Sequence, residues 1–241
     1  MPVHEPYSDP VPVQLARPSG NSAEPSRSVR FGRLFMPSLY DVLFVCASLG
    51  ILLTLQGYLL GEDGDTAWNL RIGEYILAHG LPRTEFMLST TLGNPTLYYE
   101  WLAQVVYALA LSLGGLNGVV ALAALLVGLD MTLLFWALRR RGVPLLLALF
   151  LTLVGAWLTT SVWTARAQQF TLLLTLAWSE LLWSYWRTGD RRLLWLFPVS
   201  AALWANLHPG FVGGLLMLLV ATVVAWVFPA RNRAGRVCTQ K

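Results

Sequence analysis

The chain has 241 residues, of which 56% are hydrophobic and only 12% are charged, and its mean hydropathy is +0.55. An average soluble domain has about 25% charged residues, so this composition excludes an ordinary soluble domain. Several apolar runs approach the length of about 18 residues that crosses a bilayer core, which predicts membrane helices. The net charge of +4 requires no nucleic acid partner, because basic residues at the cytoplasmic ends of spans account for it.

Composition divides the chain into three parts. Residues 1–34 are rich in Pro, Ser and Arg and lack the apolar content needed to fold alone, so we expect a disordered cytoplasmic tail. A transmembrane domain is expected over 35–228, followed by a basic cytoplasmic tail over 229–241. The only long polar segment between apolar runs, 61–101, belongs to an expected outer loop that extends over 61–115.

The expected fold is an all-α polytopic membrane protein with about six transmembrane helices. Two further helices are expected in the outer loop. Residues 66–79 have apolar side chains at helical spacing, which indicates an amphipathic helix on the membrane surface. The apolar run at 98–113 has only 16 residues, so we expect it to be amphipathic or re-entrant. The six spans are expected at 39–60, 116–138, 143–160, 170–186, 193–207 and 211–228.

The basic residues indicate the orientation in the membrane. If 98–113 does not cross and both termini are cytoplasmic, 14 of the 17 Lys and Arg residues lie on the cytoplasmic side, and only Arg71, Arg83 and Arg166 lie outside. The opposite assumption reverses this balance, and the positive-inside rule therefore favours the first arrangement. On this topology the acidic loop, Arg166, and the pair Asn206 and His208 all fall on the outer side.

Asp63 and Asp65 are the candidate chemical groups of the outer loop. A carboxylate there can take the proton of a hydroxyl nucleophile, and two carboxylates one residue apart could hold a divalent cation. The alternative is a solvated turn, because Asp and Gly are ordinary turn residues. No other cofactor is expected, and the two cysteines have no metal-binding spacing.

Three segments together resemble a known family. They are GEDGDTAWNLRIGEYILAHGLPRTEFMLSTTLGNPTLYYEWLAQVVYAL at 61–109, RAQQFTLL at 166–173 and WANLHPGF at 204–211. They are similar, in order and spacing, to the motifs D-x-D-x-W-W-H-L-x-x-G-E, P-R-T-D, H-E-W-L, R-P-x-L-F-T-L-L and W-A-N-L-H-G-G-F. These motifs are typical of bacterial GT-C-fold membrane glycosyltransferases, which use polyprenyl-phosphate-linked sugars.

The resemblance implies a function and a place in the cell. A sugar would be transferred from a polyprenyl-phosphate donor to an acceptor on the outer face of a bacterial cytoplasmic membrane. Asp65 would be the base that activates the acceptor, and Asp63 would assist it or a metal ion. Arg166 and His208 would stabilise the leaving phosphate. The remaining substrate-binding candidates are Glu100 and Asn206.

Alternatives remain open for these residues. His208 could cap a helix end, Arg166 could be an interfacial anchor, and Glu100 could interact with the start of its helix. Ala67 and Asn69 stand where the family has Trp and His, and Tyr99 stands where it has His. Family members are also usually longer, which is consistent with a truncated or inactive member, or with a partner chain that completes the fold. The second interpretation of the whole chain is therefore a non-catalytic multi-pass membrane protein, such as a transporter subunit or an assembly partner.

Overall fold

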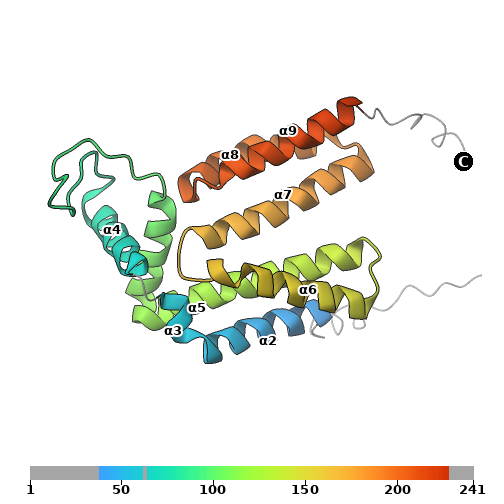
Figure 1. The fold of residues 1–241 in the computed structure, drawn as a ribbon, viewed down its shortest axis with the longest axis horizontal. Coiled ribbons are helices and arrows are strands. Elements are labelled where there is room, and N and C mark those ends of the chain that lie inside the picture. The colour runs from blue at the N-terminus through green and yellow to red at the C-terminus, as the bar shows by residue number, and fades with distance from the viewer. Residues whose placement is uncertain (1–37, 62–63, 228–241) are drawn as a thin grey trace, which may run out of the picture. The chain divides into compact units, whose positions relative to one another are not determined.

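The computed structural model describes residues 38–61 and 64–227, and these are helical apart from connecting loops and one isolated β-bridge between Thr84 and Pro95. Figure 1 shows the order of the helices. The tails expected at 1–34 and 229–241 lie outside the described residues. The elements are α2 (Leu39–Thr54), α3 (Gln56–Leu60), α4 (Asp65–His79), α5 (Trp101–Arg140), α6 (Leu145–Thr159), η1 (Thr160–Val162), α7 (Gln168–Thr188), η2 (Arg191–Trp195), α8 (Leu196–Leu207) and α9 (Phe211–Val227).

The first expected span, 39–60, is two helices. α2 begins with a capping box, in which the Ser38 side chain accepts from the backbone N–H of Asp41 and the Asp41 carboxylate accepts from the backbone N–H of Ser38. This arrangement satisfies two backbone donors that a helix start leaves unpaired. Leu55 leaves helical geometry, with φ −120° and ψ 21°, and α3 follows directly.

The segments expected at 98–113 and 116–138 are joined in α5. The element runs from Trp101 to Arg140, but Gly114 and Gly115 leave helical geometry, and the φ of Gly115 is +60°. Glycine adopts positive φ without the Cβ clash that other residues suffer. The chain therefore changes direction between the two parts of α5, as Figure 1 shows. We call residues 101–113 the first part of α5 and residues 116–140 the second part.

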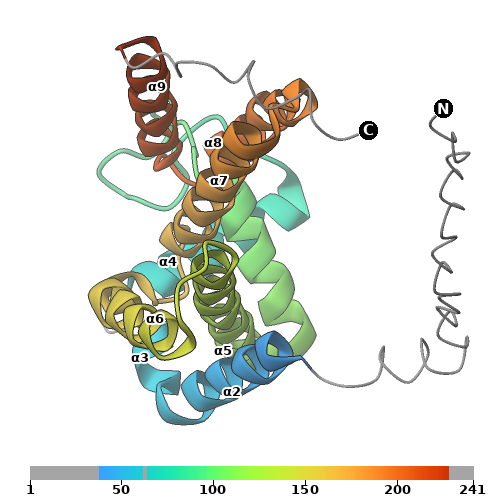
Figure 2. The same ribbon diagram turned by 90° about the vertical axis from the view of Figure 1, so that its right-hand side faces the viewer.

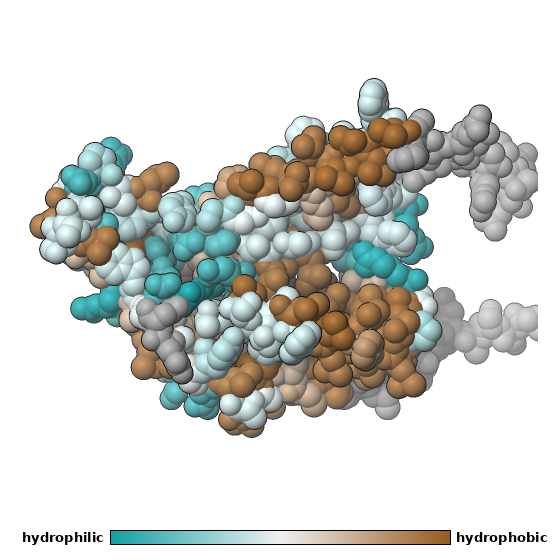
Figure 3. Space-filling model, in the orientation of Figure 1, coloured by the Kyte–Doolittle hydropathy of each residue, from teal (hydrophilic) through white to brown (hydrophobic). Residues whose placement is uncertain are grey.

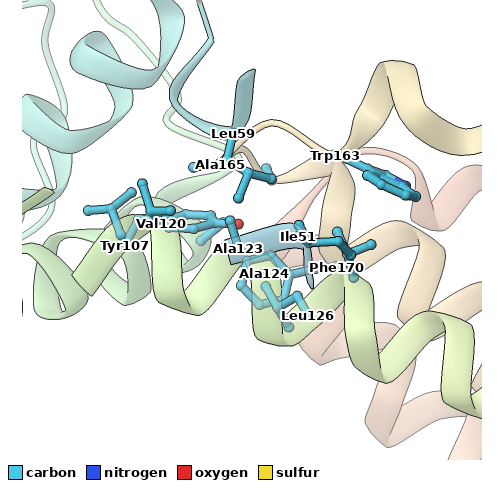
Figure 4. Close-up of a cluster of buried hydrophobic side chains, with 14 of the residues drawn as sticks. Ile51, Leu59, Tyr107, Val120, Ala123, Ala124, Leu126, Trp163, Ala165 and Phe170 are labelled. Atoms are coloured by element: carbon cyan, nitrogen blue, oxygen red, sulfur yellow. The ribbon is translucent and has the colours of Figure 1, made fainter. Parts of the chain in front are cut away.

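The second part of α5 is the centre of the largest buried cluster. Small side chains on it, including Ala123, Ala124 and Val127, are almost fully buried among residues of α2, α3 and α7. Small side chains let helices approach closely, and a Cβ on Gly128 would overlap Ser48 of α2. Figure 4 shows this cluster, with Leu59, Ala165 and Phe170 converging on α5 from separate elements.

The connections between helices lie at two opposite ends of the helical bundle (Figures 1 and 2). The segments 64–101, 160–168 and 207–211 lie at one end, which we call the acidic end because it carries Asp65, Glu85 and Glu100. The segments 139–145 and 186–195 lie at the other end, which we call the basic end because it carries Arg139, Arg140, Arg141, Arg187, Arg191 and Arg192.

The outer faces of several helices are apolar. Large hydrophobic side chains are exposed along α2, α6 and α9, and Figure 3 shows apolar surface over α6 and α9, with hydrophilic surface where α4 faces the other helices. Among the described residues, two helices are long and apolar enough to cross a membrane, Trp101–Arg140 and Leu145–Val162. α2 and α9 are apolar but shorter. The structure thus supports an all-helical fold with two such helices, and the arrangement of about six spans stays a prediction.

Candidate functional site

α4 is held against the first part of α5 by a close backbone approach. A Cβ on Gly73 would lie 2.1 Å from the carbonyl oxygen of Gln104, so any other residue at this position would push the two helices apart. Asn69, one turn earlier, accepts a hydrogen bond from Nε2 of Gln104 at 2.9 Å. Asp65 is the first residue of α4, where a negative charge interacts favourably with the helix dipole. The docking of α4 therefore determines where the Asp65 carboxylate lies.

The segment before α7 brings a guanidinium to that carboxylate. The backbone N–H of Ala165 donates to the carbonyl of Leu59 at 2.6 Å, which joins this segment to the end of α3. Gln169 is fully buried, accepts from the Tyr107 hydroxyl and donates to the carbonyl of Trp163. Between these two contacts, Nη1 of Arg166 lies 3.1 Å from Oδ2 of Asp65.

A second pair, formed by a histidine and a glutamate, lies next to the first. Nε2 of His208 is 3.5 Å from Oε1 of Glu100, and both side chains are largely buried. Burial raises the pKa of Glu100, and the nearby negative charge of Asp65 raises it further. Burial lowers the pKa of His208. Both shifts favour the neutral forms, because a charge is costly where little water can reach it.

The hydrogen bonds of His208 indicate which ring nitrogen carries the proton. Nδ1 accepts from the backbone N–H of Gly210 at 2.9 Å and lies 2.8 Å from Oγ1 of Thr171. A nitrogen that accepts a hydrogen bond carries no proton, so the neutral ring is protonated on Nε2. That N–H faces Glu100. The imidazole is therefore oriented by α7 and by the turn before α9.

The loop at 81–100 is organised around Glu85. Oε1 of Glu85 accepts from the backbone N–H groups of Phe86, Met87 and Leu88 at 2.8–3.1 Å, and Oε2 accepts from the Tyr98 hydroxyl at 3.4 Å. The backbone donors lower the pKa of Glu85, since they stabilise its charged form. This carboxylate is therefore a structural group that shapes the loop.

α4, this loop and the first part of α5 line an open cavity of about 320 Å³ at the acidic end. This volume lies at the lower end of the range for small-molecule sites. Its wall combines carboxylates, amides and aromatic rings. The lining residues are Asp65, Trp68, Asn69, Ile72, Glu85, Thr96, Leu97, Tyr98, Tyr99, Glu100 and Gln104.

The structure brings the described candidate residues together. Arg166 contacts Asp65, and Glu100 lies beside His208. Of these four residues only Asp65 and Glu100 line the cavity, so a common cleft lined by Asp65, Arg166 and His208 stays a prediction. Oδ1 of Asn206 accepts from Nε1 of Trp101 at 2.7 Å, and its Nδ2 donates to the carbonyl of Ala202 at 2.8 Å. The amide of Asn206 thus ties α8 to α5. The roles of these residues in catalysis and substrate binding stay predictions.

The cation site expected at Asp63 and Asp65 falls partly outside the described residues, because Asp63 is not among them. Within residues 38–61 and 64–227, no three His, Cys, Asp or Glu residues are grouped to hold a metal ion. Asp65 instead has a guanidinium at 3.1 Å. A divalent cation at this position stays a prediction.

Four buried or half-buried polar side chains that support the site were missed by sequence reasoning. Tyr107 and Gln104 lie within an apolar run, Gln169 lies just before an expected span, and Thr171 lies at the start of that span. Each makes its contact across at least 35 positions in the chain, Tyr107 with Gln169, Gln104 with Asn69 and Thr171 with His208. No local pattern indicates such partners. The only signal in the sequence for such a residue was a single polar side chain at helical spacing from small residues.

Comparisons with protein-family models, with curated proteins and with solved structures gave no match to this chain. The chain is therefore classified by its fold and its candidate site. The described chain is an all-helical protein with two helices apolar and long enough to cross a membrane, and it has a cavity lined by carboxylates and aromatic rings at one end of its bundle.

Proposed function

We propose that this chain is a membrane glycosyltransferase of the GT-C type, which transfers a sugar from a polyprenyl phosphate to an acceptor hydroxyl at the outer face of the cytoplasmic membrane. The main supporting observation is the Asp65–Arg166 pair, in which Asp65 is one of the residues that line the cavity. The Asp65 side chain is 63% exposed and Arg166 is 17% exposed, so the carboxylate is accessible to an acceptor while its cationic partner is largely buried.

The proposed reaction uses this pair in one displacement. The Asp65 carboxylate takes the proton of the acceptor hydroxyl, and the acceptor oxygen forms a bond to C1 of the sugar. The bond from C1 to the phosphate oxygen breaks, and its electron pair leaves with the polyprenyl phosphate. Arg166 stabilises the negative charge that develops on the phosphate. Before the donor binds, Arg166 pairs with Asp65, and the donor phosphate then competes for the guanidinium.

The remaining contacts support the same proposal. Glu100 and Nε2 of His208 lie 3.5 Å apart and offer an acceptor and a donor suited to the hydroxyl groups of a sugar. Trp68, Tyr98 and Tyr99 give the cavity wall apolar faces against which a sugar ring can pack. The exposed apolar faces of α2, α6 and α9 are suited to contact with lipid, which a polyprenyl donor requires.

One observation favours the alternative of a non-catalytic multi-pass membrane protein. Asp65 and Arg166 already contact each other, as do Glu100 and His208, and such pairs also serve as purely structural ties between helices. In that case the two pairs would tie α4 to the segment before α7, and the start of α5 to the end of α8, without chemistry. The two interpretations differ in what a neutral residue at position 65 does to turnover.

The test is transfer from polyprenyl-phosphate-linked sugars by the purified chain and its Asp65→Asn variant. Loss of a general base typically lowers the rate by about 100- to 10,000-fold, so we expect turnover to fall by that factor while the yield of folded protein is unchanged. Glu74→Gln is the matched control, because Glu74 lies on the same helix in an exposed pair with Arg71. Wild-type turnover in Asp65→Asn would refute the mechanism, and absence of turnover in the wild-type chain with every donor would favour the alternative.

A further inference from the structure

The basic end contains a cavity of its own. It has a volume of about 330 Å³ and lies between α7 and α9, where Leu182, Met217, Val220 and Val224 form apolar walls. Val220 and Val224 are about half exposed, so the cavity opens on the apolar outer surface of the bundle. Its remaining lining residues are Arg141, Ser179, Trp183, Trp186 and Ala221.

Arg141 is the only charged residue in this lining. Its guanidinium lies over the ring of Trp183, 5.1 Å from the ring centroid, and it is paired with Glu180. The Arg141 side chain remains 29% exposed, whereas Glu180 is 8% exposed. The indole N–H of Trp183, buried in the wall, has no hydrogen-bond acceptor among the described residues. The cavity thus presents an apolar slot with one partly exposed cation in its lining.

The charges around the cavity determine what kind of molecule fits it. Six arginines lie at the basic end, and the acidic side chains of the described residues there are Asp41, Glu180 and Asp190. Arg140 also approaches Glu180, at 3.7 Å, so two guanidinium groups share this one buried carboxylate. The described residues of the basic end therefore carry a surplus of positive charge. An apolar slot beside a surplus of arginine suits a molecule with a hydrocarbon chain and an anionic head.

We infer that the cavity between α7 and α9 binds an anionic phospholipid of the bilayer, with an acyl chain against Val220 and Val224 and the phosphate at Arg141. The basic end then faces the leaflet that is rich in anionic lipid. This inference rests on membrane placement and does not depend on glycosyl transfer, so an inactive chain would bind the lipid equally well.

The test is native mass spectrometry of the full chain after exchange with phosphatidylglycerol or phosphatidylcholine of identical acyl chains. A basic residue near an anionic lipid surface contributes about 1 kcal/mol, which corresponds to about a fivefold preference. We expect phosphatidylglycerol to be retained about fivefold better. Equal retention of the two lipids would overturn the inference.

Two matched variants locate the site. Val220→Phe fills the cavity and should abolish retention, whereas Val223→Phe, on the same helix and similarly exposed but outside the lining, should not. The double variant Arg141→Gln with Glu180→Gln removes the cation without leaving the buried acid unpaired, and it should lose the preference for the anionic head. Equal effects of Val220→Phe and Val223→Phe, or a preference unchanged in the double variant, would contradict the inference.

Discussion

The acidic and basic ends of the bundle each contain an ion pair between a carboxylate and arginine, but the two pairs are exposed in opposite ways. At the acidic end Asp65 is 63% exposed and its partner Arg166 is 17% exposed. At the basic end Glu180 is 8% exposed, and its partners Arg140 and Arg141 are 36% and 29% exposed. One end therefore presents a carboxylate to solvent and the other presents guanidinium groups. Which member of a pair is buried decides whether a surface can accept protons or attract anions.

The prediction with the largest expected effect tests whether the two ends lie on opposite sides of a membrane. The six-span arrangement expects reporter fusions at Gly142 and Gly189 to be cytoplasmic, and fusions at Gly93 and Thr164 to be external. Alkaline phosphatase and green fluorescent protein fusions give an all-or-none readout. An external signal at Gly142 would place both ends on the wrong sides and remove the six-span arrangement.

The second prediction compares the same substitution at both ends. Arg141→Gln leaves Glu180 buried with only Arg140, at 3.7 Å, so we expect a loss of stability of about 2 kcal/mol or more. Arg166→Gln leaves Asp65 largely exposed to water, so we expect a loss of about 1 kcal/mol or less. Thermal unfolding in one detergent measures both. Restoring neutrality with Glu180→Gln in the Arg141→Gln background should recover most of the loss, and equal losses in the two single variants would contradict the comparison.

The smallest expected effect is a dependence of stability on pH at the acidic end. The pKa of folded His208 is lowered below its ordinary value of 6.5, so folding favours the neutral ring. The corresponding stability is present above pH 6.5 and is lost as the pH falls through the folded pKa. Wild-type protein should therefore lose stability relative to His208→Gln as the pH is lowered from 7 to 5.

Glu100→Gln provides a control for which stability is expected to change with pH in the opposite direction. The pKa of folded Glu100 is raised above its ordinary value of 4.5 by burial and by Asp65. The stability that comes from its neutral form is present below pH 4.5 and is lost as the pH rises through the folded pKa. Wild-type protein should thus lose stability relative to Glu100→Gln as the pH rises above 4.5. A stability difference that does not change with pH in either variant would contradict the burial of this pair.

The helical elements could be predicted from the sequence because their signals are local. Apolar runs located α4, α6, α7, α8 and α9 to within about three positions, and α4 at 65–79 was expected at 66–79. Two boundaries differed. Leu55 interrupts the first run although no Gly or Pro marks the position, and Gly114 with Gly115 bends α5 where two separate helices were expected.

The acidic residues within apolar runs show that a local sequence pattern does not specify the partner of a buried side chain. Asp130 and Glu180 occupy similar sequence contexts, each several residues from a group of arginines. In the structure Glu180 pairs with Arg140 and Arg141 across the bundle, whereas the buried carboxylate of Asp130 has no hydrogen-bond partner among the described residues. Helical periodicity specifies the face on which an acid lies but not which residue of another helix meets it.

The sequence by itself determined that the chain is helical and apolar, and that Asp65, Glu100, Arg166, Asn206 and His208 lie at helix ends. Composition and periodicity are properties of neighbouring residues, so the printed chain is enough to read them. Only the tertiary structure decided that Arg166 contacts Asp65 and that His208 faces Glu100. Those contacts join positions about 100 residues apart, and they depend on how closely helices approach at residues such as Gly73. Close packing sets that approach, because a single added Cβ is enough to separate two helices.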